Sequence, residues 1–208
     1  MSERWHPVAA DELPGRVAGW LAEAPGIVRV AVDGAPASEP EAFAAALVPE
    51  LERAGRPVAL IRADTFWRDA SLRLEYGRED VEAYLNLWLD ADALRREVLD
   101  PVAASGRYLP SLRDPATNRA TRQRPAELGP DGVLIVAGSL LLGRRLPFDR
   151  TVHLYLSSGA LARRMPREMA WTVPAFQRYG VEVAPSESAD LVVKVDDVRH
   201  PAVRGGGL

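Results

Sequence analysis

A glycine turn between a strand pattern and a helix pattern is the first candidate for chemistry in this sequence. The apolar segment "IVRVAVD" (27–33) ends at Gly34, and an alanine-rich helical pattern follows from Glu39. This is the arrangement in which backbone N–H groups and a helix N-terminus bind phosphate. A G-x-x-x-x-G-K-[ST] loop also needs a second glycine, a lysine and a hydroxyl. The chain has Glu39, Pro40 and Glu41 at those positions.

These replacements oppose phosphate binding. Pro40 supplies neither a cation nor a backbone donor. A carboxylate ~4 Å from a phosphate charge costs on the order of 4 kcal/mol at an effective dielectric of ~20. The pattern Ser38-Glu39-Pro40-Glu41 instead fits a capping box, with Ser38 at the N-cap and Glu41 reaching back over the first turn. We therefore favour a helix that caps itself over a phosphate-binding loop of new design.

A carboxylate at the end of a second strand pattern is the next candidate. "PVALIRAD" (57–64) ends on Asp64, which Phe66 and Trp67 follow. Asp64 could accept the proton of a substrate hydroxyl in a pocket walled by the aromatic residues. It could equally cap a turn after the strand, with the aromatic residues in the core.

The composition narrows the classes of function. The 208 residues include no Cys and three His, and Lys194 is the one lysine among 26 basic residues. These counts exclude disulfides and thiolate nucleophiles, and the His spacing predicts no metal site. A net charge of −3 gives no basic surface for nucleic acid. Without an apolar run of 18 residues or a signal-peptide core, we expect no membrane span and a cytoplasmic location.

The order of the elements predicts a three-layer α/β fold with a five-stranded parallel sheet. Apolar strand patterns separated by helical patterns are typical of this class, and they cover residues 27–33, 57–64, 132–142, 150–157 and 189–197. His153 is interpreted as a packed strand residue.

The chain is expected to form one domain over residues 1–208. It would contain a helix at 8–24, helices at 158–180 broken by prolines, and a frayed tail at 204–208. The polar segment 106–131 is either a long functional loop or a short hairpin.

In their order and spacing, several segments resemble the uridine kinase-like (phosphoribulokinase/uridine kinase) family of P-loop kinases. Besides the strand leading to Gly34, they are "RADTFWRD" (62–69), "VEAYLNLWLDADALRREVLDPV" (81–102), "GRYLPSLRDPAT" (106–117), "VLIVAGSLLL" (133–142), "LARRMPRE" (161–168) and "RYGVEVAPSESADLVVKVDD" (178–197). The resemblance implies a P-loop NTPase fold of the nucleoside/nucleotide kinase type.

The resemblance also implies roles for individual residues. Asp64 matches the general base, and Ala137 stands where the family carries an acid for Mg²⁺. The candidate substrate-binding residues are Phe66, Trp67, Tyr84, Tyr108 and Arg113. The remnant of the phosphate loop comprises Gly34, Ser38, Glu39, Pro40 and Glu41. The candidate lid arginines, Arg163, Arg164 and Arg167, either bind phosphate or form a solvated face next to Glu168.

Three hypotheses follow. The first is a protein with a degenerate phosphate loop that does not use ATP in the usual way, needs no cofactor, and binds a nucleoside-like ligand or a protein partner. The alternative is an active nucleoside or small-molecule kinase, using Mg-ATP with lid arginines in place of the lysine. The third is a structural interaction module whose pocket is filled. Whether the chain forms a homo-oligomer is left open.

Overall fold

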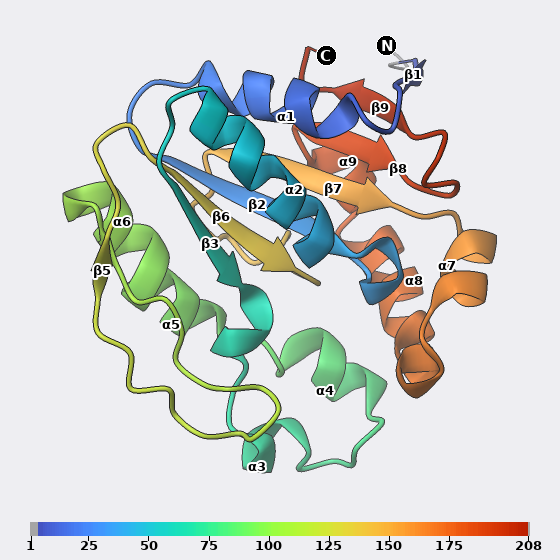
Figure 1. Ribbon diagram of the computed structural model, residues 1–208. Coiled ribbons are helices and arrows are strands. Elements are labelled where there is room, and N and C mark those ends of the chain that lie inside the picture. The colour runs from blue at the N-terminus through green and yellow to red at the C-terminus, as the bar shows by residue number, and fades with distance from the viewer. Residues whose placement is uncertain (1–3, 208) are drawn as a thin grey trace.

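A seven-stranded sheet with helices on both faces organises the computed structural model, which describes residues 4–207 (Figure 1). In chain order the strands are β1 (His6–Pro7), β2 (Val28–Gly34), β3 (Val58–Arg62), β4 (Arg107–Tyr108), β5 (Ala126–Glu127), β6 (Val133–Gly138), β7 (Arg150–Tyr155), β8 (Leu191–Lys194) and β9 (Ala202–Gly205). The α-helices are α1 (Leu13–Ala22), α2 (Pro40–Arg53), α3 (Ala70–Arg73), α4 (Val81–Asn86), α5 (Ala91–Leu94), α6 (Asp100–Ser105), α7 (Ser158–Arg164), α8 (Val173–Glu182) and α9 (Pro185–Ser188). Three 3₁₀ turns, η1 (Pro36–Ser38), η2 (Ala63–Phe66) and η4 (Arg167–Thr172), and the π turn η3 (Arg95–Leu99) complete the fold.

The centre of the sheet is parallel, as predicted. The strand order is β1-β9-β8-β7-β2-β6-β3, and the five strands from β8 to β3 pair in parallel. β2 lies between β6 and β7, so the chain crosses over β6 through α2 before it forms β3. The three-layer α/β fold class with its five parallel strands is therefore confirmed.

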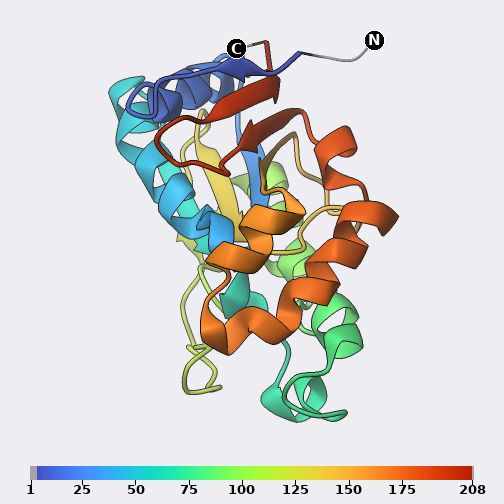
Figure 2. The same ribbon diagram turned by 90° about the vertical axis from the view of Figure 1, so that its right-hand side faces the viewer.

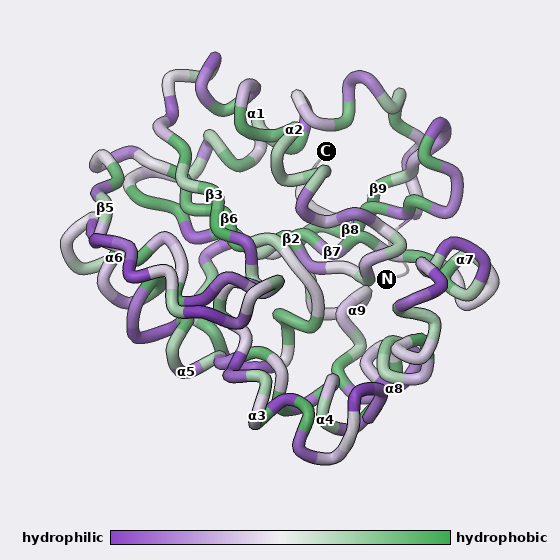
Figure 3. The backbone as a smooth tube through the Cα atoms, turned by 60° about the horizontal axis from the view of Figure 1, so that its bottom comes forward, coloured by the Kyte–Doolittle hydropathy of each residue, from purple (hydrophilic) through white to green (hydrophobic). Residues whose placement is uncertain are grey.

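Alternating side chains of the central strands build two hydrophobic cores. Val30 and Ile135 face the layer of α1 and α2, whereas Ala31 and Leu134 face the layer that contains α4 and α8. Figure 2 shows the two helical layers on opposite sides of the sheet. The strands run through the hydrophobic part of the chain, and hydrophilic segments gather in the outer connections (Figure 3). Burial on both faces explains why these strands read as continuous apolar runs.

The chain ends correct two sequence-based expectations. The helix expected at 8–24 spans only Leu13–Ala22. The tail expected to fray at 204–208 instead enters β9, which pairs antiparallel with β8 and β1, and residue 208 lies outside the described residues. The run of glycines in this segment suggested a disordered tail, but the backbone conformation of Gly205 within β9 requires a glycine. Its φ is +83°, and a Cβ there would lie 2.3 Å from the Asp190 carbonyl oxygen.

The structure also shows the conformation of the polar segment 106–131 and of the proline-containing helical region 158–180. Residues 106–131 form a hairpin, in which β4 pairs with β5 and an isolated bridge joins Arg113 to Ala120. The helical region 158–180 is interrupted at Pro166, as expected, whereas Pro174 lies in the first turn of α8, where proline is tolerated. Within residues 4–207, no helix is long and apolar enough to cross a membrane.

A buried carboxylate ties the centre of the sheet to the helical layer. Asp33, at the end of β2, is fully buried and lies 2.8 Å from His153 Nδ1 on β7. Its Oδ1 accepts a hydrogen bond from the Leu141 N–H at 2.9 Å, and its Oδ2 accepts one from the Tyr179 hydroxyl at 3.0 Å. Tyr179 in turn accepts the Leu142 N–H at 3.0 Å. His153 is thus a packed strand residue, and it belongs to a polar network.

Replacing Asp33 should therefore destabilise the protein strongly. In Asp33→Asn, one carboxylate oxygen becomes an NH₂ group that cannot accept from Tyr179. We expect the free energy of unfolding to fall by about 3 kcal/mol, measured by urea denaturation. Asp11→Asn, at an exposed turn, is the control and should stay within about 0.5 kcal/mol of wild type. Equal stability of the two variants would contradict this role.

Truncation tests the role of β9. A chain ending at Pro201 loses the buried Val203 and exposes the edge of β8. We expect it to lose at least about 2 kcal/mol of stability and to self-associate, seen by thermal denaturation and light scattering. A chain ending at Gly205 retains the strand and should behave as wild type. Loss of stability in both truncations would show that β9 is not the cause.

Candidate functional site

A pocket of ≈ 170 Å³ opens at the carboxyl ends of β2, β3 and β6. Its lining comprises Pro36, Glu41, Ala63, Asp64, Trp67, Tyr84, Trp88, Leu89, Gly138, Ser139, Leu140, Arg144 and Met169. In parallel α/β sheets, ligands bind outside the carboxyl ends of the strands, where neighbouring crossovers diverge. This sheet has such a point, because β2 is flanked by β6 and β7, neither of which follows it directly in the chain.

Asp64 lines this pocket from η2, the turn after β3. Its carboxylate forms an ion pair with Arg62, whose Nε donates to Oδ1 at 3.2 Å. The side chain of Asp64 is 16% exposed and that of Arg62 58%, so a largely buried carboxylate is paired with an arginine that reaches solvent. Asp64 makes no side-chain cap at this turn. The pocket-facing interpretation of Asp64 therefore agrees with its placement.

The two aromatic residues after Asp64 separate. Phe66 is fully buried in the core, whereas Trp67 lines the pocket. The chain around Trp67 pairs with the chain around Trp88, because the Arg68 N–H donates to the Trp88 carbonyl at 2.8 Å and the Asp90 N–H to the Phe66 carbonyl at 2.9 Å. This pairing places the Trp67 and Trp88 rings 5.0 Å apart, nearly perpendicular at 75°.

Tyr84 extends the aromatic wall. Its ring lies 5.0 Å from that of Trp88 at 72°. Burial raises the pKa of Tyr84, although the Ser139 hydroxyl next to its phenol oxygen opposes that shift. The phenol therefore stays neutral and can donate a hydrogen bond. Ser139 donates its own hydroxyl to the Gly34 carbonyl at 2.7 Å, which joins the end of β6 to the end of β2.

The loop from β2 to α2 does not form the predicted capping box. The N-cap of α2 is Glu39, in the left-handed conformation with φ = 55°, and it makes no side-chain cap. Ser38 lies one residue earlier and donates its hydroxyl to the Ala35 carbonyl at 2.7 Å. The expectation fails because the loop first forms the 3₁₀ turn η1, which directs the Ser38 side chain inward against Gly34. The contact is so close that a Cβ atom on Gly34 would lie 2.3 Å from the Ser38 hydroxyl oxygen.

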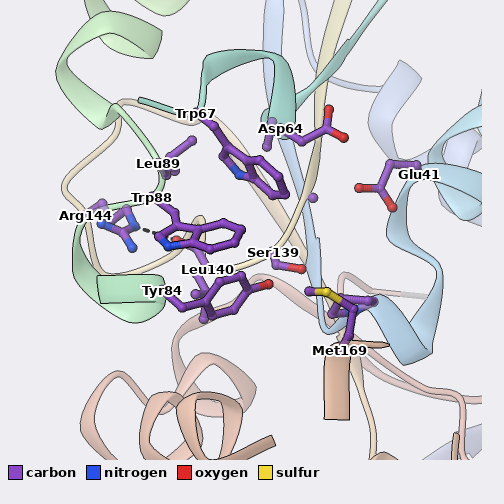
Figure 4. A pocket seen from close by; sticks show the side chains of 13 residues that line it. Glu41, Asp64, Trp67, Tyr84, Trp88, Leu89, Ser139, Leu140, Arg144 and Met169 are labelled. Atoms are coloured by element: carbon purple, nitrogen blue, oxygen red, sulfur yellow. Dashed lines mark hydrogen bonds between the residues drawn. The ribbon is translucent and has the colours of Figure 1, made fainter. Parts of the chain in front are cut away.

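The two glutamates of this loop point in different directions. Glu39 is exposed, Pro40 is buried, and Glu41 is half-buried and lines the pocket. Figure 4 shows the carboxylates of Glu41 and Asp64 on the same side of the pocket, across from the aromatic rings. Burial raises the pKa of Glu41, and the charge of Asp64 adds to this effect, while its own backbone N–H and Arg62 oppose it.

The remaining predicted site residues lie outside the pocket lining. Ala137 is fully buried in β6 within the core beneath α2. Tyr108, on β4, is partly buried against the other core. Arg113 forms an ion pair with Asp69 at 3.1 Å and donates to the Asn118 carbonyl at 2.7 Å, so it holds the hairpin to the segment after β3.

The candidate lid arginines are not brought together at the pocket. α7 ends at Arg164, which donates to the Val195 carbonyl, and Arg163 and Arg167 are exposed on either side of Pro166. The lid-like segment contributes Met169 to the pocket instead.

Sequence reasoning missed several lining residues, including Trp88, Ser139, Arg144 and Met169. The four-residue spacing from Tyr84 to Trp88 was the available signal for an aromatic pair. Arg144 carried no such signal. Its Nε donates to the Leu140 carbonyl at 2.6 Å, and its guanidinium also reaches the Leu85 carbonyl. Among residues 4–207, no group of three or more His, Cys, Asp or Glu is placed to hold a metal ion.

The chain is similar in structure to kinases. It matches a possible uridine kinase from Bacillus stearothermophilus with a TM-score of 0.69 and 22% identity, over 88% of this chain and 96% of the other. It also matches a proposed fructose transport system kinase from Silicibacter sp. TM1040, with a TM-score of 0.62 and 24% identity over 85% and 94% of the two chains. No protein-family model and no curated protein matches it. At these identities the likeness establishes the P-loop kinase-like fold.

The pKa of Glu41 predicts a pH-dependent stability. Because this pKa is raised from its ordinary 4.5 in the folded protein, the folded state binds the proton more readily than the unfolded chain. Ionised Glu41 therefore costs stability above its folded pKa, and this cost disappears as the pH falls toward 4.5. We expect Glu41→Gln to raise the melting temperature at neutral pH, with the difference from wild type shrinking as the pH is lowered.

The neighbouring Glu39 supplies the control for this measurement. Glu39 is exposed, so Glu39→Gln should leave the melting temperature close to wild type at each pH. A Glu41→Gln variant less stable than wild type at neutral pH would mean that contacts of the carboxylate outweigh its burial.

Proposed function

We propose that this is a uridine kinase-like protein with a degenerate phosphate loop, which does not use ATP in the usual way and binds a nucleoside-like or similar small ligand beside Asp64. The observation that carries the proposal is the internal bonding of the β2–α2 loop. The Ser38 N–H donates to the Ala35 carbonyl at 2.8 Å, and the Glu39 N–H donates to the Pro36 carbonyl at 3.1 Å.

Internal bonding matters because phosphate binding at a helix N-terminus needs several free N–H groups directed at one point. The N–H groups of Ser38 and Glu39 already donate to carbonyls within η1, and Pro40 has no N–H group. The carboxylate of Glu41 lies against its own backbone N–H, in the first turn of α2. A negative side chain there already interacts favourably with the helix dipole.

Among the described residues 4–207, the two arginines next to the pocket already have partners: Arg62 pairs with Asp64, and Arg144 donates to the Leu140 and Leu85 carbonyls. Lys194 lies on β8, 3.5 Å from Asp196, and the candidate lid arginines lie outside the pocket lining. A phosphate seated on this loop would face Glu41 without the usual lysine. These features support a protein that does not hold the outer phosphates of ATP here.

The open pocket favours ligand binding over a purely structural module. It contains two carboxylates, a guanidinium, a phenol and a serine hydroxyl beside aromatic rings, the combination expected for a small ligand with both polar and apolar parts. Asp64, 16% exposed, is available to accept a hydrogen bond from a ligand hydroxyl.

The alternative function is an active small-molecule kinase with a rebuilt donor site. The placement of Asp64 in an open pocket at the end of β3 favours it, because a phosphoryl acceptor needs a carboxylate to take its proton. In that case the phosphate donor would have to bind through groups other than residues 34–41.

The two candidates differ in what they predict for Mg-ATP. We expect calorimetry to detect no binding of Mg-ATP to the protein, and assays with nucleosides and several nucleoside triphosphates to give no product above background. In a thermal-shift panel, nucleosides and related alcohols should include stabilising ligands, whereas Mg²⁺ and ATP should not stabilise. A Trp67→Leu variant should lose the response to any stabilising ligand. Mg-ATP binding at micromolar strength together with turnover would establish the alternative.

A further inference from the structure

The pocket has two walls of opposite chemical character. Trp67, Trp88 and Tyr84 form one side, and the carboxylates of Glu41 and Asp64 lie across from them (Figure 4). Glu41 comes from α2 and Asp64 from η2, Trp67 follows η2 directly, and α4 and the residues after it carry Tyr84 and Trp88. Aromatic faces opposite carboxylates suit a ligand with carbon surface and positive charge.

Edge-to-face contacts join the three rings of the aromatic wall. Trp88 meets Trp67 at 75° and Tyr84 at 72°, each with ring centroids 5.0 Å apart. Near-perpendicular rings present faces in different directions around one corner. Ring faces carry the negative end of the aromatic quadrupole, and they attract cations placed within about 6 Å of the centroid.

The protein already uses the same rings to bind a cation of its own. The Arg73 guanidinium carbon lies 5.0 Å from the Trp67 centroid and 4.8 Å from the Trp88 centroid. Arg73 is buried and lies outside the pocket lining. Trp67 and Trp88 are therefore positioned for cation–π contact, and their pocket side is open to a second group.

The charges next to the pocket leave Glu41 without a direct partner. Arg62 is paired with Asp64, and Arg144 donates to the Leu140 and Leu85 carbonyls. Figure 4 shows Arg144 beyond Trp88, on the side away from the two acids. No ion pair of Glu41 occurs among residues 4–207. Arg62 acts on Glu41 only through its charge, because its guanidinium is paired with Asp64. The half-buried Glu41 carboxylate is therefore only partly compensated, and a bound cation would relieve the remaining cost.

We propose that the ligand of this pocket is a small organic cation, whose ammonium group lies between Glu41 and Asp64 and whose carbon atoms pack against Trp67, Trp88 and Tyr84. The inference rests on the proposed ligand-binding function and names its chemical class. An anionic ligand would meet both carboxylates, and a neutral one would leave Glu41 only partly compensated.

Matched pairs of probes test the preference for positive charge. Choline is compared with its neutral carbon isostere 3,3-dimethylbutan-1-ol, and benzylamine with benzyl alcohol, at neutral pH. Binding is followed by quenching of tryptophan fluorescence and by calorimetry. In at least one pair the cation should bind at least about tenfold more tightly than the neutral compound. The preference should persist in Glu39→Gln and disappear in Glu41→Gln.

The melting temperature of each variant shows that it is folded, and Glu41→Gln is expected to be at least as stable as wild type. Equal binding within both pairs, absence of any cation binding, or an unchanged preference in Glu41→Gln would overturn the inference. Binding of a neutral nucleoside without Mg-ATP binding would leave the proposed function standing while this inference fails. Mg-ATP seated over residues 34–41 would instead remove the proposed function.

Discussion

The pocket depends on the hydrogen bonding of one fully buried carboxylate. Asp33 lies near the end of the central strand β2. Its carboxylate is hydrogen-bonded to His153 on β7, to Tyr179 on α8 and to the Leu141 N–H in the loop after β6. Because a buried charge is tolerated only when it is well paired, these groups have little freedom to move apart. Burial also raises the pKa of Tyr179, so its hydroxyl remains a donor to Asp33. Residues 138–140, which line the pocket, are followed directly by Leu141 and Leu142, whose N–H groups donate to Asp33 and Tyr179. These two hydrogen bonds hold this part of the lining in place.

The β2–α2 loop combines the path of a phosphate-binding loop with hydrogen bonds made within the loop. The loop still runs from a glycine at the strand end to a helix N-terminus, as phosphate-binding loops do. The N–H groups of Ser38 and Glu39, however, are used within the η1 turn, and the Ser38 hydroxyl packs close to Gly34. Fold and function are separable at this point, as in many nucleotide-binding architectures.

The two glutamates of the β2–α2 loop differ in their surroundings. Glu41 is retained facing the pocket although its burial is unfavourable, and its neighbour Glu39 is turned to solvent. Functional sites commonly hold groups in environments that cost stability. The aromatic wall opposite Glu41 belongs to the same arrangement, because its rings bring hydrophobic surface and a negative electrostatic face together.

Local patterns in the sequence determined the five parallel strands, the break at Pro166 and the placement of Asp64 and Trp67 at the end of β3. Each depends on periodicity or turn chemistry within a few residues. Tertiary structure alone decided that the glycine-rich end forms β9, that Trp88 lies beside Trp67, and that Glu41 faces the pocket while Glu39 does not. The physical reason is that strand pairing, ring contacts and side-chain burial depend on residues far apart in the chain, whose proximity no local period specifies.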